Sequence, residues 1–298
     1  MLFRSMLEEK CHIPVVGVAP YLQVEIEDED SLTERFDNKR TVDLIDIAVI
    51  RTPRISNFTD FNPLEMIPGV SLRYVTSVNE LKDPDMIILP GTKNTMGDLA
   101  WLRQNGLEAA ILKAVANGKI IFGVCGGYQM LGDVLSDPHG TEEGGEMRGL
   151  GLIPIDTIFE KEKTRTRVTG HYSQVDGLLA DISHVAFEGY EIHMGITTLK
   201  DGVKPLTQMQ NLNTKDANRS DGAYANNVYG TYVHGIFDKE ESAKAIITAI
   251  AKQKGINTED MATMDFGKFK ETQYDLLAEG LRAHLDMSAI YKILEEGL

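Results

Sequence analysis

Residues 119–132 have the sequence KIIFGVCGGYQMLG, and this segment decides the fold. Its first half is a continuous apolar run that predicts a buried strand, and its last residues predict the start of a helix. Cys125 stands at the turn between them, so we expect its side chain at the carboxyl edge of a sheet. The neighbouring glycines allow a sharp bend and the close approach of a substrate. A helix N-terminus behind the cysteine favours thiolate over thiol, which is typical of an activated nucleophile.

Apolar runs on the amino-terminal side of this segment predict a parallel sheet. The predicted strands span residues 45–50, 72–75 and 85–89, and helical apolar spacing covers residues 98–117. Gly118 is a plausible end for that helix. Strands that alternate with helices pair in parallel, and their ligands bind beyond the carboxyl ends of the strands. Both Gly91 and Cys125 are expected at that edge.

The second half of the chain is richer in strands and ends in helices. Strands are predicted over residues 149–158, 166–169, 189–193 and 228–233, and helices over residues 239–254 and 269–294. We therefore expect an α/β fold with a mostly parallel twisted sheet and flanking helices. Extra strands belong to the second half, and the carboxyl terminus is helical.

Composition excludes several classes of partner. A formal charge of −15 and a pI near 4.9 argue against nucleic acid and anionic membranes. Cys11 and Cys125 are too few for a disulfide framework, and no Cys-x-x-Cys pair indicates a metal site. No apolar stretch is long enough for a membrane span, and residues 1–12 lack a secretory apolar core. We expect a cytoplasmic protein.

A nucleophilic thiol needs a base, and His234 is the best candidate among the seven histidines. It ends an apolar strand and precedes a glycine, as expected for a turn at the sheet edge. His193 has a similar setting, although an isolated histidine is more often a hydrogen-bonded structural residue. Backbone amides of Gly126 and of the Gly91 turn could supply an oxyanion site. For Gly91 the simpler alternative is an ordinary turn after a strand.

Five motifs together resemble the class I (triad-type) glutamine amidotransferases. They are LPGTKNT (89–95), CGGYQMLG (125–132), GYEIHMG (189–195), YVHGIFD (232–238) and LRAHLDMSAIYKIL (281–294). The match is most specific to the cobyric acid synthase branch and runs from about residue 44 to the end. It implies the flavodoxin-like fold of that class.

The resemblance also implies the reaction. Cys125 would attack the side-chain amide of glutamine to form a thioester, and His234 would protonate the departing ammonia and then activate water. Gly91 and Gly126 would supply the oxyanion donors, and Gln129 would line the glutamine pocket. The ammonia would pass to a carboxylate activated by ATP. In this branch the acceptor is a corrinoid, adenosylcobyrinic acid a,c-diamide, which belongs to cobalamin biosynthesis.

One departure from the family concerns the acid of the triad. Most triad-type members carry it two residues after the histidine, where this chain has Ile236. A dyad, or an acid from elsewhere in the chain, is therefore implied. Asp238 and Glu191 are the nearest candidates in the sequence, and His193 is a further supporting candidate.

A second departure concerns domains, because no phosphate-loop motif is present. Residues 1–40 resemble a remnant of an ATP-dependent synthetase domain with a linker, and residues 13–22 resemble its last strand. Residues 44–254 would form the amidotransferase domain, with residues 255–298 as a helical extension packed on it. This chain would then bind no cofactor itself, and ATP and Mg would need the synthetase domain in cis or in trans.

Several alternatives stay open at this point. The chain could be the amidotransferase subunit of another ligase, of the cobyrinic acid a,c-diamide synthase or lipid II isoglutaminyl synthase type. It could be another cysteine hydrolase on a similar sheet, such as a peptidase or a chaperone-like thiol protein. A non-catalytic docking module that keeps the fold is a third alternative, against which the pairing of Cys125 with His234 argues.

Overall fold

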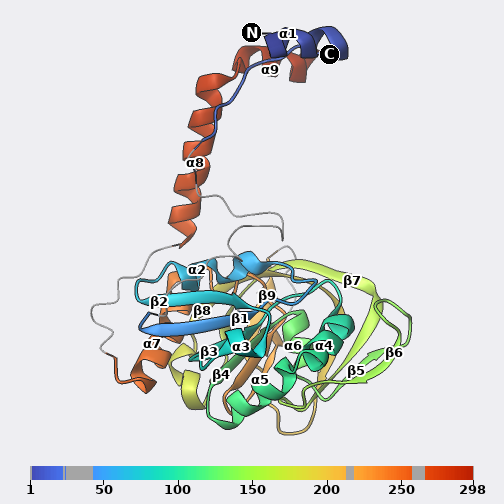
Figure 1. Ribbon diagram of the computed structural model, residues 1–298, viewed down its shortest axis with the longest axis vertical. Helices are drawn as coiled ribbons and strands as arrows, with labels where there is room; N and C mark the ends of the chain where they lie inside the picture. Colours follow the sequence, from blue (N-terminus) through green and yellow to red (C-terminus); the bar gives the residue numbers. More distant parts are fainter. Residues whose placement is uncertain (1, 23, 25–42, 213–217, 257–265, 298) are drawn as a thin grey trace. The chain divides into compact units, whose positions relative to one another are not determined.

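The computed structural model describes residues 2–22, 24, 43–212, 218–256 and 266–297 (Figure 1). Contacts divide the chain into two compact units. Unit 1 comprises residues 1–27 and 267–298, and unit 2 comprises residues 28–266. Among the described residues, the buried hydrophobic core lies in unit 2.

The first sheet of unit 2 has six strands in the order β11-β12-β4-β3-β1-β2. Five of them run in parallel, and β11 pairs antiparallel with β12. Their bounds are Ile45–Ile50 (β1), Val70–Val75 (β2), Met86–Leu89 (β3), Ile120–Val124 (β4), Ala223–Ala225 (β11) and Val228–Thr231 (β12). Strands β1, β3 and β4 are buried along their whole length, because their sequences are apolar, apart from Asp46 of β1, and suit a sheet covered on both faces. The buried Asp46 carboxylate pairs with the Arg73 guanidinium of β2.

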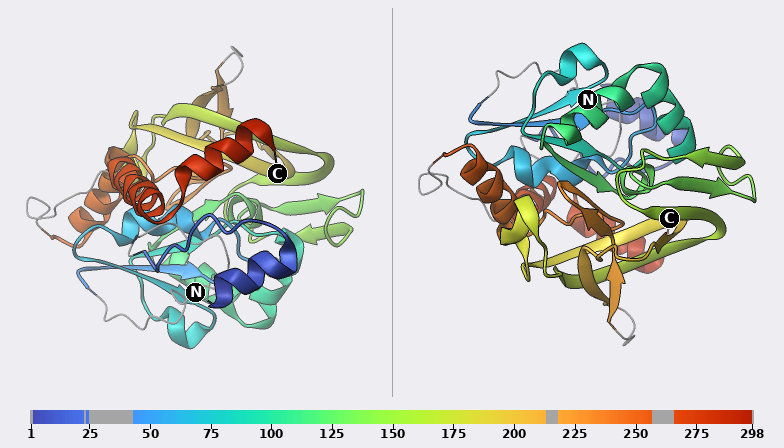
Figure 2. Two further views of the ribbon diagram at one scale, coloured as in Figure 1. Left: turned by 90° about the horizontal axis from the view of Figure 1, so that it is seen from above. Right: turned by 90° about the horizontal axis from the view of Figure 1, so that it is seen from below.

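The second sheet is mixed and supplies the extra strands expected in the second half. Its order is β10-β9-β7-β5-β6, with β8 paired to β7. The bounds are Val134–Asp137 (β5), Gly145–Arg148 (β6), Ile155–Tyr172 (β7), Ala186–Leu199 (β8), Thr207–Asn211 (β9) and Arg219–Asp221 (β10). The long strands β7 and β8 run side by side as an antiparallel pair (Figure 2). Together the two sheets confirm the α/β fold class.

Helices of unit 2 connect and cover the strands. They are η2 (Phe58–Phe61), α2 (Asn62–Glu65), α3 (Val78–Leu81), α4 (Thr95–Gln104), α5 (Leu107–Ala116), α6 (Gly126–Met130), η3 (Gly177–Ile182) and α7 (Glu240–Gln253). The apolar face of α7 is buried and contacts β1 and β8.

Two sequence-based boundaries were wrong. Residues 98–117 form two helices rather than one, because Gly106 lies between them in the left-handed region with φ 74°, which an α-helix cannot continue through. The strand predicted from residue 149 begins at Ile155. The preceding amides of Gly149 and Leu150 donate to the carbonyl oxygens of Asp133 and Met130 instead of joining a ladder.

Unit 1 contains α1 (Leu2–Cys11), α8 (Phe266–His284) and α9 (Met287–Glu296). The Asp286 carboxylate accepts from the Ala289 amide at 3.0 Å, so α9 starts as a new helix after α8. Residues 13–22 run alongside α8 as an extended segment (Figure 1). One isolated β-bridge joins Gly17 of this segment to Leu285, the residue after α8. This bridge is the only β pairing of the segment among the described residues. The strand expected here is therefore not formed.

The contacts therefore group residues 1–27 with residues 267–298, a pairing that the sequence analysis did not anticipate. The origin of residues 1–40 in a synthetase domain stays a prediction, and residues 25–42 and 257–265 lie outside the described part of the chain. None of the described helices combines the length and the hydropathy that a membrane crossing requires.

Candidate active site

Cys125 occupies a strained turn between β4 and α6. Its backbone has φ 51° and ψ −109°, and its amide donates to the carbonyl oxygen of Thr231 at 2.8 Å. Such a left-handed conformation is sparsely populated by residues with a side chain and is typical of nucleophile elbows. The bend brings Gly127 against β3, where an added Cβ would lie 1.9 Å from the Leu89 carbonyl oxygen. Glycine is therefore required at this turn.

Three neighbouring parallel strands bring the site together. In the register of the sheet, Leu89 of β3 pairs with Gly123 of β4, and Thr231 of β12 pairs with Val124. The residues just beyond these strands are Gly91, Cys125 and His234, so they meet at one sheet edge. A Cβ added to Gly91 would lie 3.0 Å from Cε1 of His234.

His234 is fixed on several sides. Its Nδ1 lies 2.7 Å from Oδ2 of Asp60, whose other oxygen accepts from the Gly235 amide at 3.0 Å. The Tyr190 ring stacks on the imidazole with centroids 5.2 Å apart. Asp60 and His234 are both buried, at 4% and 1% exposure. With Nδ1 held by a carboxylate, the other ring nitrogen is left for Cys125, whose side chain interacts with the imidazole.

The charge state of His234 follows from these neighbours. Burial lowers the pKa of the imidazole, but the carboxylate of Asp60 and the thiolate of Cys125 outweigh it and raise the pKa to about 10. The arrangement therefore favours an imidazolium at neutral pH. Sγ of Cys125 also lies 3.7 Å from the Ile192 carbonyl oxygen of β8.

The loop after β3 lies against the elbow. A Cβ added to Gly126 would meet the Thr92 amide nitrogen at 3.2 Å, so the backbone of this loop lies close to that of Gly126. The loop is held from behind by the buried carboxylate of Asp98, which accepts from the Thr92 hydroxyl at 2.6 Å. The Gly91 carbonyl oxygen accepts from the Ser56 amide at 2.8 Å, which fixes the peptide plane that precedes Thr92. Fixed backbone donors of this kind suit a developing oxyanion.

Gln129 lies beneath the elbow, buried to 3% exposure. Its Oε1 accepts from the Thr95 hydroxyl at 2.8 Å, and its Nε2 donates to the Tyr232 hydroxyl at 3.1 Å. Tyr232 and Thr197 share a further hydrogen bond of 2.7 Å. Gln129 therefore joins α4, α6, β8 and the segment before His234 in one polar network.

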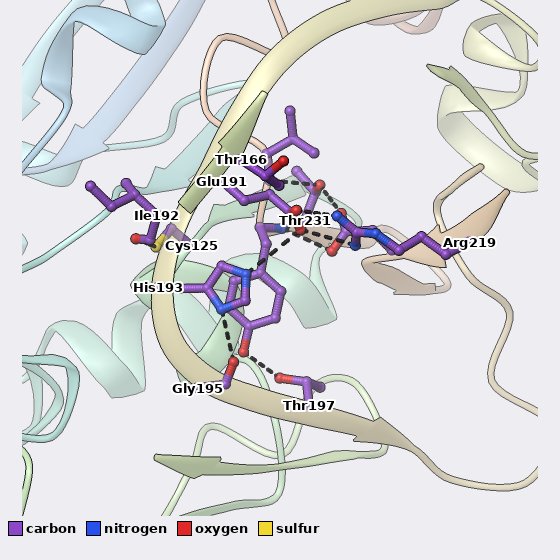
Figure 3. A network of polar contacts seen from close by, with 12 residues as sticks. Cys125, Thr166, Glu191, Ile192, His193, Gly195, Thr197, Arg219 and Thr231 are labelled. Atoms are coloured by element: carbon purple, nitrogen blue, oxygen red, sulfur yellow. Dashed lines mark hydrogen bonds and ion pairs between the residues drawn. The ribbon is translucent and has the colours of Figure 1, made fainter. Parts of the chain in front are cut away.

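The two acids suggested by the sequence have other positions. The Glu191 carboxylate lies between the Arg219 guanidinium, with which it pairs, and the His193 ring (Figure 3). Burial opposes its ionisation, but the contacts with His193 and Arg219 lower the pKa of Glu191. The amide of Asp238 donates to the Gly235 carbonyl oxygen at 2.9 Å. The acid on Nδ1 of His234 is instead Asp60.

His193 does not take part in the Cys125 pair. Its Nδ1 lies 2.8 Å from the Gly195 carbonyl oxygen, and its ring stacks on Tyr232 at 3.8 Å between centroids (Figure 3). Its Nε2 is 3.6 Å from Glu191 Oε1, which exceeds a hydrogen-bond length. A cavity of about 470 Å³ opens beside these residues, with Arg165 and Asp221 also in its lining. Among the described residues, no group of three or more His, Cys, Asp or Glu side chains is arranged to hold a metal.

Sequence reasoning missed Asp60. It lies in η2, ten residues beyond the carboxyl end of β1, and no local motif marks it. One signal was available: an acid shortly after a predicted strand of the parallel sheet lies near the edge that carries the nucleophile.

Comparison with known proteins identifies the family. The profile of the CobB/CobQ-like glutamine amidotransferase domain matches residues 46–242. The chain belongs to this family. The resemblance stated from the sequence motifs is thereby confirmed.

Several relatives of this chain are named cobyric acid synthase. The cobyric acid synthase of Ruminiclostridium cellulolyticum is 55% identical over 295 residues, which cover 99% of this chain and 57% of the relative. That of Lachnoclostridium phytofermentans is 52% identical over 307 residues, covering 100% of this chain and 59% of the relative. The chain thus spans a little more than half of the length of these relatives, at their carboxyl-terminal end.

A solved structure supports the fold. A chain in the structure of PurLQS from Thermotoga maritima matches with a TM-score of 0.50 and 19% identity, covering 70% of this chain and 99% of that one. The mostly parallel α/β arrangement of class I glutamine amidotransferases is therefore shared.

Proposed function

We propose that this chain hydrolyses glutamine to glutamate and ammonia as the glutaminase part of a cobyric acid synthase. The observation that carries the proposal is the buried row of Cys125, His234 and Asp60 at the edge of the parallel sheet. A thiolate, an imidazole and an orienting carboxylate are the parts that nucleophilic amide hydrolysis needs. Membership of the amidotransferase family gives the substrate class.

The reaction balances with these residues alone. The Cys125 thiolate adds to the side-chain amide carbon of glutamine, and the oxyanion faces the backbone amides of Gly126 and of the Gly91 turn. Protonated His234 gives its proton to the departing nitrogen, so that ammonia leaves and a glutamyl thioester remains. Neutral His234 then takes a proton from water, which attacks the thioester. Glutamate leaves, and the thiolate and imidazolium are restored.

Asp60 would act through His234. Its carboxylate on Nδ1 selects the tautomer that presents the other nitrogen to the thiol, and it stabilises the imidazolium in both steps. Gln129 would form the floor of the glutamine pocket, as a positioning residue in the network with Thr95 and Tyr232.

The name of the relatives supports an acceptor from cobalamin biosynthesis. We propose adenosylcobyrinic acid a,c-diamide, a corrinoid with free carboxylates, as the acceptor. Activation of those carboxylates by ATP and Mg belongs to the part of the relatives that this chain does not match, supplied in cis or in trans.

Glutamate release by the purified chain tests the first step. Cys125→Ala is expected to abolish turnover, whereas Cys11→Ala, which removes the exposed cysteine, leaves it unchanged. A diazo-ketone analogue of glutamine should label Cys125 alone. Undiminished glutaminase activity in Cys125→Ala would refute the proposal, and failure to label would favour another cysteine hydrolase.

The amidation step needs a separate assay. The chain is mixed with glutamine, ATP, Mg and the corrinoid, and corrinoid amides are measured. We expect none from this chain alone and amide formation when the unmatched part of a relative is supplied. Amidation by this chain alone would overturn the assignment of ATP chemistry to that part.

A further inference from the structure

Strand β8 of the second sheet is bonded to the turn that carries the catalytic histidine. The His234 amide donates to the Tyr190 carbonyl oxygen at 2.8 Å, and the Tyr190 amide donates to the His234 carbonyl oxygen at 3.0 Å. A Cβ added to Gly189 would lie 2.2 Å from that same carbonyl oxygen of His234, so glycine is required at this close approach. The backbone of β8 therefore holds Tyr190 in a fixed place beside His234.

The side chain of Tyr190 covers one face of the imidazole. The two ring centroids are 5.2 Å apart and the ring planes are inclined by 22°, which is a stacked arrangement. His234 is buried, whereas Tyr190 is only partly buried. The face of a tyrosine ring carries negative partial charge and attracts a cation within about 6 Å of its centroid. Stacking of this kind therefore favours the imidazolium over the neutral imidazole.

One short turn holds both partners of His234. Asn57 precedes η2 in the left-handed region, with φ 53° and ψ 35°, a conformation that asparagine adopts more readily than most residues. Its Nδ2 donates to the Tyr190 hydroxyl at 2.5 Å, and its carbonyl oxygen accepts from the Asp60 amide at 3.1 Å. The turn thus places a carboxylate on the edge of the imidazole and fixes the ring that lies on its face.

We propose that Tyr190 is a positioning residue of the catalytic row, whose ring stabilises protonated His234 and is itself held in place by Asn57. The contact of Asp60 with Nδ1 sets one point of the imidazole, and the stacked face sets its plane. The inference deepens the proposed function and rests on it, because the imidazolium is the proton donor to the departing ammonia. It makes the second sheet part of the catalytic machinery.

The titration of His234 in the purified chain tests the role of the ring. Carbon-13 NMR of the histidine Cε1 atoms measures its midpoint, and His234→Asn identifies its signal. Tyr190→Leu keeps an apolar side chain but removes the ring face, so it should lower this midpoint by about one pH unit. Tyr190→Phe keeps the ring face and should keep the midpoint.

The charged groups around His234 stay in place in these variants, so a changed midpoint reports the ring. They are the Asp60 carboxylate on Nδ1, the Cys125 side chain, the Asp238 carboxylate at the Gly235 turn, and the ion pair of Lys239 with Glu188 on the flanking residues.

Glutamate release gives the second readout. Tyr190→Leu should lower kcat about tenfold at neutral pH with little change in KM, because an imidazole that has lost its plane transfers protons poorly. Asn57→Gly keeps the left-handed turn and removes only the side-chain bond, so it and Tyr190→Phe should each lower kcat about threefold. The double variant should lose no more than either single one, since both remove the same contact.

Tyr224→Leu is the matched control for the loss of a tyrosine ring. Tyr224 stacks on Tyr229 with centroids 5.9 Å apart, away from the site, so its replacement should leave both the midpoint and kcat unchanged. An unchanged midpoint in Tyr190→Leu would overturn the proposal. Equal losses of kcat in Tyr190→Leu and Tyr190→Phe would also overturn it, because the hydroxyl rather than the ring would then carry the effect.

A fluorinated ring keeps the test decisive if Tyr190→Leu fails to fold. Pentafluorophenylalanine placed at position 190 has the shape of phenylalanine, but its ring face is positive rather than negative. It should lower the midpoint of His234 relative to Tyr190→Phe, and equal midpoints in these two variants would overturn the proposal.

The NMR midpoint does not depend on glutamine hydrolysis, which keeps the two proposals apart. If the proposed function fails, no glutamate is released but the midpoint still moves in Tyr190→Leu. If the inference about the ring fails, glutamate is released and the midpoint stays where it is.

Discussion

The carboxylate of Asp60 lies 2.7 Å from Nδ1 of His234, although 174 residues separate the two along the chain. The same carboxylate accepts from the amide of Gly235, so it fixes both the ring and the turn that carries it. Most family members carry the acid two residues after the histidine. This chain has Ile236 at that position, and its side chain is fully buried among apolar residues. An acid from η2, which follows β1 in the chain, makes the contact with Nδ1 instead.

Replacement of this acid should impair the reaction without removing the thiol. Asp60→Asn is expected to lower kcat for glutamine hydrolysis by about 10²- to 10⁴-fold, because the amide no longer selects the tautomer or stabilises the imidazolium. Steady-state glutamate release measures it. Asp238→Asn, which changes the acid nearest in the sequence, should retain most of the activity. Equal losses in the two variants would argue against the role of Asp60.

The raised pKa of His234 predicts how stability depends on pH. A group whose pKa is higher in the folded state than in the unfolded state stabilises the fold fully below its unfolded pKa, and this stabilisation is lost as pH rises through the folded pKa. For His234 the window runs from about 6.5 to about 10. The free energy of unfolding of the parent should therefore fall more steeply across this window than that of Asp60→Asn. Urea titrations at several pH values measure both, and parallel curves would contradict the prediction.

The elbow should not tolerate a side chain at Gly127. Gly127→Ala would place a Cβ 1.9 Å from the Leu89 carbonyl oxygen, and forcing β3 and α6 apart costs about 3 kcal/mol or more of folding free energy. Thermal or urea unfolding measures the loss. Gly140→Ala is the control, because Gly140 has φ 64° and open space around it. The stability lost in this variant measures backbone strain alone, which we expect to cost about 1 kcal/mol. A loss at Gly127 no larger than at Gly140 would show that the elbow can relax.

The Tyr232 hydroxyl should matter for glutamine binding. Tyr232→Phe removes the acceptor of the Gln129 amide and the contact with Thr197, so Gln129 loses its fixed position. We expect kcat/KM for glutamine to fall about tenfold, mainly through KM, with a stability loss of about 1 kcal/mol. Tyr224→Phe is the matched control, since it removes a hydroxyl bonded to the Gln174 carbonyl oxygen away from the site. An unchanged KM in Tyr232→Phe would exclude a role for this network in binding.

The sequence by itself determined the parallel sheet and the place of Cys125 at its edge. Apolar runs of strand length alternating with helices leave few arrangements other than a parallel sheet, and a cysteine between glycines after such a run has to stand at its carboxyl edge. His234 could be chosen for the same reason, because it follows a strand of the same kind. These inferences depend on residues close in the sequence, and local patterns record them.

The tertiary structure alone decided the partner of His234, the surroundings of Glu191 and the grouping of the two chain ends. Asp60 reaches the histidine because β1 and β12 end at the same edge, and nothing in the residues around either one encodes that proximity. Glu191 and His193 are two residues apart on β8, so their side chains share one face and line the cavity with Arg219, whereas the backbone carbonyl oxygen of Ile192 between them lies 3.7 Å from Sγ of Cys125. Contacts between residues far apart in the chain are set by how the elements pack, and a single sequence carries no local signal for them.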